Sequence, residues 1–204
     1  MKIDKGEITA LVLAGGRGRR MGGVDKGLVE LDGQPLVGHL IHAIAPQVGA
    51  LLISANRNRA RYRAFGYPVV SDELDGFQGP LAGFLAGMKH IPTPWMITVP
   101  CDAPLLPADY VRRMADALAA AGTAIAVAHD GSRLQPVHAL IARSLYGALE
   151  RYLAGGDRQI ERWYRQQGAV AVDFSDHPDV FRNLNTAEER DRLEREHMPG
   201  VDKE

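Results

Sequence analysis

Short apolar segments alternate along this chain with longer segments in which apolar residues recur at helical spacing. The short segments are continuously apolar, which is typical of strands covered on both faces of a sheet. Strands that alternate with helices predict a parallel sheet with right-handed crossovers. We expect strands at Ile8–Leu13, Leu51–Ser54, Val69–Val70, Trp95–Val99 and Ala124–Ala128.

Three apolar stripes predict helices between these strands. The stripes run from Leu36 to Val48, from Leu81 to Met88 and from Val111 to Leu118, and Gly122 ends the third. Each stripe gives its helix one apolar face, and such a face packs against a sheet. The first half of the chain therefore predicts an α/β domain.

The pattern changes after the fifth expected strand. Asp130-Gly131 predicts a turn, and Val137–Ile141 follows closely enough to pair antiparallel. The sheet is therefore expected to be mixed, although mostly parallel. Later segments predict helices at 144–153 and 157–167 and a strand at 169–174, and Thr186 with Glu189 forms a capping-box signature.

Length and composition limit the function classes. A chain of 204 residues predicts one domain, here residues 1–198, with a disordered tail at 199–204. The 24 Lys and Arg against 25 Asp and Glu argue against a nucleic-acid-coating protein. One cysteine excludes a disulfide framework and a multi-cysteine zinc site. No apolar run approaches the length of a membrane span, so we expect a cytoplasmic protein that binds no membrane.

A glycine-rich, cationic segment directly follows the first expected strand, at residues 13–26. Glycines let the backbone approach phosphates closely and turn its amides inward. The segment carries four cations against the single acid Asp25: Arg17, Arg19, Arg20 and Lys26. The spacing fits neither the P-loop nor the dinucleotide fingerprint. A polyphosphate site is favoured because such folds bind ligands where strands end, and a solvated surface loop is the alternative.

Two acidic residues stand just after expected strands. Asp102 follows the strand Trp95–Val99, and Asp72 follows Val69–Val70. Parallel strands end at one edge, so Asp102 could reach a magnesium ion held by phosphates, since Mg²⁺ takes one or two carboxylates plus phosphate oxygens. The alternative for each is a turn or capping aspartate. Gly79 then opens a helix in a segment where a base or sugar could lie against the backbone.

Several motifs occur together in an order that resembles a known family. They are Leu13-Ala14-Gly15-Gly16, Arg20-Met21-Gly22, Asp25-Lys26, Gly79-Pro80-Leu81-Ala82-Gly83, Pro100-Cys101-Asp102, Gln135-Pro136 and Asn183-Leu184-Asn185-Thr186. This set resembles the molybdenum cofactor guanylyltransferases, bacterial enzymes that join GMP to molybdopterin. The resemblance implies a three-layer α/β/α Rossmann-like nucleotidyltransferase fold, with GTP and molybdenum-molybdopterin as substrates and Mg²⁺ as cofactor.

The resemblance also implies roles for individual residues. Lys26 would contact the phosphates and Asp102 would hold the metal; in the predicted mechanism Lys26, Arg20 and the ion at Asp102 are the catalytic groups that neutralise charge. Asn183 and Asn185 match positions on the molybdopterin side. Ser54 stands where the family often has asparagine, and Gly16 favours guanine over cytosine. The GTP-binding set would be Leu13, Ala14, Gly15, Gly16, Lys26, Ser54, Asp72, Gly79 and Asp102.

The predicted reaction is direct nucleotidyl transfer. A phosphate monoester has a second pKa near 6, so the acceptor is largely dianionic at neutral pH and needs no general base. Cys101 is expected to be a small buried hydrophobe rather than a nucleophile. The alternatives are a cytidylyltransferase of the same fold and a nucleotide-binding regulatory module without catalysis. Transient contacts with cofactor-biosynthesis proteins and acceptor molybdoenzymes are also expected.

Overall fold

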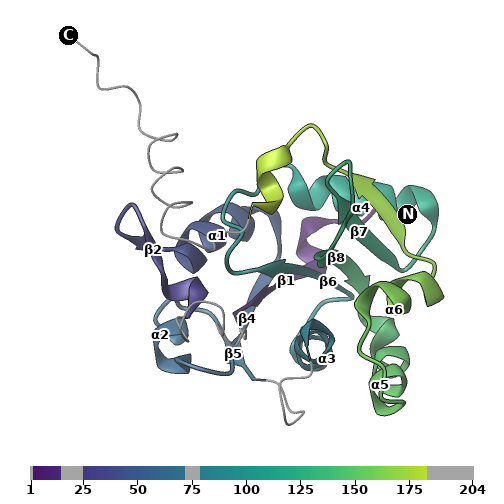
Figure 1. The fold of residues 1–204 in the computed structure, drawn as a ribbon, viewed down its shortest axis with the longest axis horizontal. Coiled ribbons are helices and arrows are strands. Elements are labelled where there is room, and N and C mark those ends of the chain that lie inside the picture. Colours follow the sequence, from purple (N-terminus) through teal and green to yellow (C-terminus); the bar gives the residue numbers. More distant parts are fainter. Residues whose placement is uncertain (1, 15–24, 72–78, 183–204) are drawn as a thin grey trace.

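A seven-stranded sheet forms the centre of the protein. The computed structural model describes residues 2–14, 25–71 and 79–182. Across the sheet the strands follow the order β5-β4-β1-β6-β8-β7-β9 (Figure 1). Their bounds are β1 Ile8–Leu13, β4 Ala50–Ser54, β5 Val69–Val70, β6 Trp95–Pro100, β7 Ile125–His129, β8 Leu134–Ala142 and β9 Val170–Asp173. A separate hairpin pairs β2, Glu30–Leu31, with β3, Gln34–Pro35.

The strand directions confirm a mixed, mostly parallel sheet. β5, β4, β1 and β6 are parallel neighbours, and β9 is parallel to β7. β8 is antiparallel to both β6 and β7, as the turn signal at Asp130-Gly131 predicts. β8 begins at Leu134, three residues before the expected start, because the half-buried Gln135 and Pro136 interrupt the apolar run.

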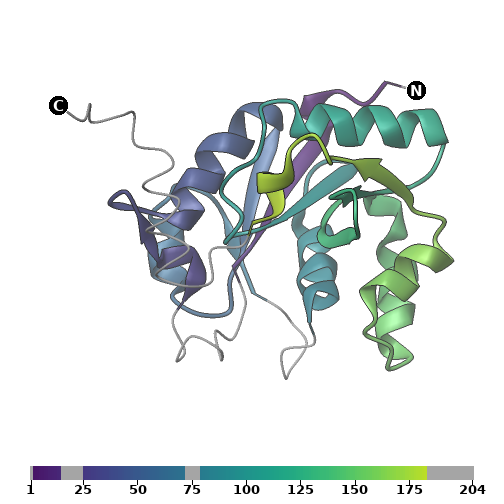
Figure 2. The same cartoon turned by 45° about the horizontal axis from the view of Figure 1, so that its top comes forward.

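Helices cover both faces of the sheet. On one face lie α1, Leu36–Ile44, and α4, Tyr110–Ala121; on the other lie α3, Pro80–His90, α5, Tyr146–Ala154, and α6, Ile160–Gln166 (Figure 2). A short helix, α2, covers Arg59–Arg63. The 3₁₀ turns are η1 Lys5–Glu7, η3 Lys26–Leu28, η4 Ala45–Gln47, η5 Arg143–Leu145 and η6 Pro178–Phe181.

Alternate residues of each central strand feed two separate cores. Ala10 and Val12 of β1 pack in the cluster that contains α1 and α4, and Leu11 packs in the cluster that contains α3, α5 and α6. Strand side chains alternate between the faces of a sheet, so a strand apolar at every position supplies both layers. This packing makes the three-layer α/β/α arrangement.

The helix boundaries follow local sequence signals. α4 ends at Gly122, whose φ of +63° lies in the left-handed region and whose amide bonds Leu118 O. Glycine adopts that conformation without steric cost, so the sequence prediction of this end is confirmed. No helix in the described ranges has the length and apolar character needed to cross a membrane.

One buried histidine makes a testable contribution to acid sensitivity. His138 of β8 is 3% exposed, and burial lowers its pKa to about 3. The unfolded chain takes up this proton near pH 6.5 and the folded chain does not, so stability is expected to fall as pH drops from 6.5 towards 3. Between pH 7 and 4.5 the free energy of unfolding should fall by roughly 2–3 kcal/mol more in the wild type than in His138→Gln. Urea unfolding of both proteins at pH 7 and pH 4.5 measures these free energies. Equal losses in the two proteins would contradict the prediction.

Candidate functional site

The ends of four parallel strands form one row of residues at an edge of the sheet. Leu13 pairs with Ser54 of β4 on one side and with Pro100 of β6 on the other, and Ser54 pairs with Val70 of β5. We call this edge the carboxyl rim. Ligands of open α/β sheets bind outside such strand ends.

Backbone hydrogen bonds extend the row by one residue on each strand. Ala14 N donates to Ser54 O at 2.8 Å, and Cys101 N donates to Leu13 O at 3.0 Å. The peptide segments that leave β1 and β6 therefore start side by side. This geometry brings Leu13, Ala14 and Ser54, three predicted nucleotide contacts, next to the residue that precedes Asp102.

Lys26 and Asp102 meet at this rim. Lys26 Nζ lies 3.1 Å from Asp102 Oδ2, although 76 positions separate the two residues in the chain. The side chain of Asp102 is 12% exposed and that of Lys26 is 30% exposed. A largely buried carboxylate therefore faces a partly exposed ammonium, and solvent screens such a pair less than it screens a surface ion pair.

The donor set at Asp102 suits a magnesium ion bound together with phosphates. Within the described ranges no three His, Cys, Asp or Glu side chains gather into a metal cluster. Mg²⁺ does not require such a cluster, because it retains waters and uses one or two carboxylates plus substrate phosphate oxygens. Asp102 can supply the carboxylate: Oδ2 accepts a hydrogen bond from Lys26, and within the described ranges no donor bonds Oδ1.

Cys101 lies beside these groups without being suited to nucleophilic attack. Its side chain is buried, and burial is the largest cause that raises the pKa of the thiol well above its usual range. Only the thiolate is a strong nucleophile, so the protonated thiol is unreactive at neutral pH. This agrees with the sequence prediction of a buried hydrophobe.

Gly79 begins α3 in a conformation that favours glycine. It has φ +81° and ψ −173°, and Pro80 follows at the first helical position. A side chain is strained in that region of backbone space. The other end of α3 lies near the opposite edge of the sheet, where Arg143 Nε donates to Met88 O. α3 therefore begins on the rim side, which places Gly79 towards the other candidates.

Six predicted site residues fall outside the described ranges: Gly15, Gly16, Arg20, Asp72, Asn183 and Asn185. The capping-box pair Thr186 and Glu189 and the tail at 199–204 fall outside them as well. The described part of the site therefore consists of the ends of β1, β4 and β6, Lys26, Asp102 and Gly79.

The structure adds two residues that the sequence interpretation missed, Tyr62 and Asn58. Tyr62 Oη donates to Asp25 Oδ1 at 2.6 Å, and Asn58 Nδ2 donates to Asp25 Oδ2 at 2.8 Å. No local pattern signals these bonds, because Tyr62 stands 37 positions from Asp25. The left-handed φ of Asn58, +48°, marks it as unusual only once coordinates exist.

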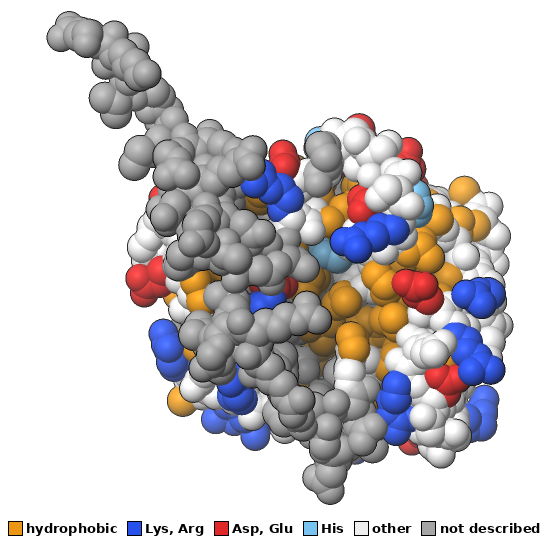
Figure 3. Space-filling model, viewed as in Figure 1, with side chains coloured by type: hydrophobic (Ala, Val, Ile, Leu, Met, Phe, Trp, Pro, Cys, Tyr) orange, Lys and Arg blue, Asp and Glu red, His pale blue; other side chains and the backbone are white. Residues whose placement is uncertain are grey.

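A hollow of about 480 Å³ lies between the loop that follows Asp102 and the segment that contains η6. The loop that follows Asp102 forms one wall, and η6 with the residues before it forms the other. Its lining residues are Leu105, Leu106, Pro107, Asp176, His177, Asp179 and Val180. On the face seen in Figure 3, hydrophobic side chains gather near the middle, with Lys and Arg side chains around them.

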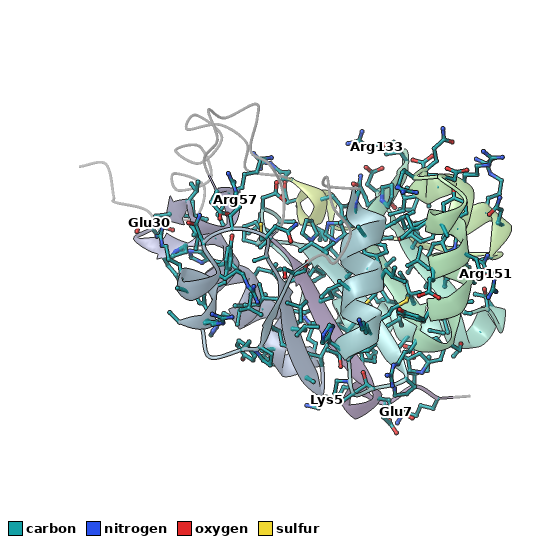
Figure 4. All side chains as sticks on the ribbon, turned by 90° about the horizontal axis from the view of Figure 1, so that it is seen from below. Lys5, Glu7, Glu30, Arg57, Arg133 and Arg151 are labelled. Atoms are coloured by element: carbon teal, nitrogen blue, oxygen red, sulfur yellow. The ribbon has the colours of Figure 1, made fainter. Side chains whose placement is uncertain are left out.

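Side chains from both halves of the chain reach the carboxyl rim. Arg57 follows the end of β4, and Arg133 precedes β8; both lie along one side of the molecule in Figure 4. Lys5 and Glu7, which precede β1, lie on the opposite side. The carboxyl rim therefore collects loops from both the parallel and the antiparallel parts of the sheet.

Comparison with known proteins agrees with this arrangement. The family description "MobA-like NTP transferase domain" matches residues 10–171. The chain is 50% identical over 187 residues to the molybdenum cofactor guanylyltransferase of Shewanella loihica, covering 92% of this chain and 95% of that protein. It is also 50% identical over 186 residues to the enzyme of the same name from Shewanella putrefaciens, covering 91% of this chain and 95% of that one.

Solved structures show the same fold. Molybdopterin-guanine dinucleotide biosynthesis protein A from Archaeoglobus fulgidus aligns with a TM-score of 0.74 at 22% identity, over 92% of this chain and 97% of that one. The 4-diphosphocytidyl-2C-methyl-D-erythritol synthase of Anaerococcus prevotii aligns with a TM-score of 0.72 at 11% identity, over 94% and 96%. At these identities the likeness concerns the fold alone.

Proposed function

The chain belongs to the MobA-like NTP transferase family, among the molybdenum cofactor guanylyltransferases, and from this we propose that it transfers GMP from GTP to molybdenum-molybdopterin. The observation that carries the proposal is the contact of Lys26 with Asp102, 3.1 Å apart at the carboxyl rim, in a chain half identical to enzymes of that name. One cation beside one largely buried carboxylate at the carboxyl rim suits a magnesium–triphosphate substrate.

In the proposed reaction an oxygen of the terminal phosphate of molybdopterin attacks the α-phosphorus of GTP. A new P–O–P bond forms, the bond between the α-phosphorus and its bridging oxygen breaks, and pyrophosphate leaves with the electron pair. The acceptor is largely dianionic at neutral pH, so no side chain has to remove a proton. The protein's contribution is positioning and charge neutralisation.

The described residues divide this work between them. Lys26 places its ammonium where the phosphates of the nucleotide would lie, and Asp102 would hold Mg²⁺. When bound, the ion would neutralise charge on the phosphate oxygens. Leu13, Ala14, Ser54 and Gly79 would offer backbone and small side chains to the nucleoside. The buried thiol of Cys101 stays protonated and takes no part.

We place the acceptor in the hollow between the loop after Asp102 and η6. The lining of the hollow begins at Leu105, three residues after the predicted metal ligand, and η6 ends two residues before Asn183, which with Asn185 matches the molybdopterin side. In this arrangement donor and acceptor meet at Asp102.

Other expectations stay predictions. They are the cytoplasmic location, the transient contacts with cofactor-biosynthesis proteins and acceptor molybdoenzymes, and the assignment of residues 1–198 to one catalytic domain.

Product analysis tests the function directly. The purified protein is incubated with Mg²⁺, molybdenum-molybdopterin and either GTP or CTP, and the products are identified by mass spectrometry. We expect the guanine dinucleotide with GTP and little product with CTP. A cytosine dinucleotide formed at an equal or higher rate would assign the chain to the cytidylyltransferases. Binding of magnesium–GTP without any product would indicate a regulatory module.

A further inference from the structure

The carboxylate of Asp25 is held from both of its oxygens by one segment. Tyr62 Oη donates to Oδ1 at 2.6 Å, and Asn58 Nδ2 donates to Oδ2 at 2.8 Å. Both donors come from the segment that follows β4 and includes α2. Hydrogen bonds to a charged acceptor are the strong ones, and two of them fix both the position and the rotation of the carboxylate.

The two donors are themselves fixed. The side chain of Tyr62 is fully buried in the core that contains α1 and α4. Asn58 adopts a left-handed backbone conformation before α2, and its carbonyl accepts hydrogen bonds from the amides of Arg61 and Tyr62. Asparagine tolerates that conformation better than most residues. Asp25 is therefore attached to a rigid part of the fold.

Gly27 allows this attachment by its lack of a side chain. A Cβ at residue 27 would lie 2.6 Å from Tyr62 Oη and 2.9 Å from Cys101 Sγ, closer than real Cβ atoms come. The phenol thus passes over Gly27 to reach Asp25. The phenol therefore contacts Asp25 and Gly27, the residues on both sides of Lys26. The side chain of Lys26 itself extends to Asp102.

We propose that Tyr62 and Asn58 are positioning residues that hold Lys26 in its catalytic place through Asp25. The inference rests on the proposed function, because it assigns them to the same phosphate-binding lysine. Displacing a catalytic group by about 1 Å can cost roughly a hundredfold in rate, so a rigid anchor one residue away from Lys26 has a direct kinetic consequence.

The electrostatics keep the anchor intact across the working pH range. Burial is the largest cause that raises the pKa of Tyr62 far above its usual value, and Cys101 and Asp25 raise it further. The phenol therefore stays protonated and continues to donate to Asp25. Tyr62→Phe removes this one donor while keeping the aromatic ring that fills the core.

The decisive experiment compares Tyr62→Phe with wild type and with a matched buried control, Tyr110→Phe. Tyr110 is also fully buried, and its hydroxyl contacts His138 rather than Asp25. We expect Tyr62→Phe to lower kcat roughly 10- to 100-fold, while Tyr110→Phe stays within about twofold of wild type. Melting temperatures measured alongside show whether both variants are folded. An equal loss of kcat in the two variants would overturn the proposal.

A double-mutant cycle then separates positioning from a general structural role. If Tyr62 acts through Lys26, adding Tyr62→Phe to Lys26→Met should change kcat by less than about twofold. A full additional loss in the double variant would show that Tyr62 acts independently and would contradict the inference. The two proposals can fail separately: a wild type that forms no guanine dinucleotide refutes the function, whereas an active wild type with an additive cycle refutes only the positioning.

Discussion

Asp102→Ala is expected to lower the rate of GMP transfer by at least about a hundredfold while leaving the fold intact. Asp102 Oδ2 bonds Lys26 at 3.1 Å, and the side chain is only 12% exposed, so its charge acts in a weakly screened environment. Removing the carboxylate takes away the proposed metal ligand and leaves Lys26 without this partner. Pyrophosphate release at saturating GTP and molybdenum-molybdopterin measures the loss.

A distant aspartate provides the control for that measurement. Asp116 lies on the exposed face of α4, where it pairs with Arg112 at 3.5 Å. Asp116→Ala should stay within about twofold of wild type, since exposed pairs of this kind contribute little. Near-normal transfer by Asp102→Ala would refute the metal-binding role. A magnesium titration adds a second readout, because Asp102→Asn should need more Mg²⁺ if the carboxylate holds the ion.

Lys26→Met is expected to cause a loss of similar size, about a hundredfold or more in kcat. The substitution keeps an unbranched side chain and removes the charge that neutralises the phosphates. Lys26→Arg should recover only part of the rate, because a planar guanidinium does not reproduce the compact ammonium that reaches Asp102. Steady-state kinetics in GTP gives kcat and KM separately, and nucleotide binding is followed by calorimetry.

Lys5→Met is the matched control for this lysine. Lys5 belongs to η1, which precedes β1, and it lies on the side of the molecule opposite Arg57 (Figure 4). Its Nζ donates to Pro46 O at 3.3 Å, and it bonds none of the predicted site residues that the structure describes. The Lys5→Met protein should transfer GMP at the wild-type rate. If Lys26→Met were as active as Lys5→Met, the phosphate-binding role of Lys26 would be wrong.

The parts of the fold that repeat a simple pattern could be predicted from the sequence. β1 and β5 coincide with the expected residues, and β4, β6, β7 and β9 differ from them by one residue at one or both ends. Continuous apolar runs mark buried strands because both faces of the sheet are covered, and parallel strands must end at one edge. From these two facts it follows without coordinates that Asp102 lies at the same edge of the sheet as the end of the first strand, whereas the pairing of β1 with β6 needs the structure.

Other parts depend on partners that no local pattern specifies. Tyr62 occupies an apolar position, so the sequence indicates a core residue and gives no sign that its hydroxyl bonds Asp25. β8 could be located, but its start could not be predicted, because Gln135 and Pro136 give no apolar signal and lie beyond the last residue that pairs with β6. His138 similarly gives no sequence signal of burial, since its neighbours on the strand determine its environment.

The reversal of β8 lets one edge of the sheet receive chain segments from both halves of the protein. β7 and β9 end there, β8 begins there, and the four strands of the first half also end there. A purely parallel sheet would need another long crossover helix for each added strand end. Here a short hairpin turn is enough to bring the later half beside the earlier one. Under the proposed function, the loops that would hold the nucleotide and the loops that would hold the acceptor are thereby gathered on one edge of the sheet.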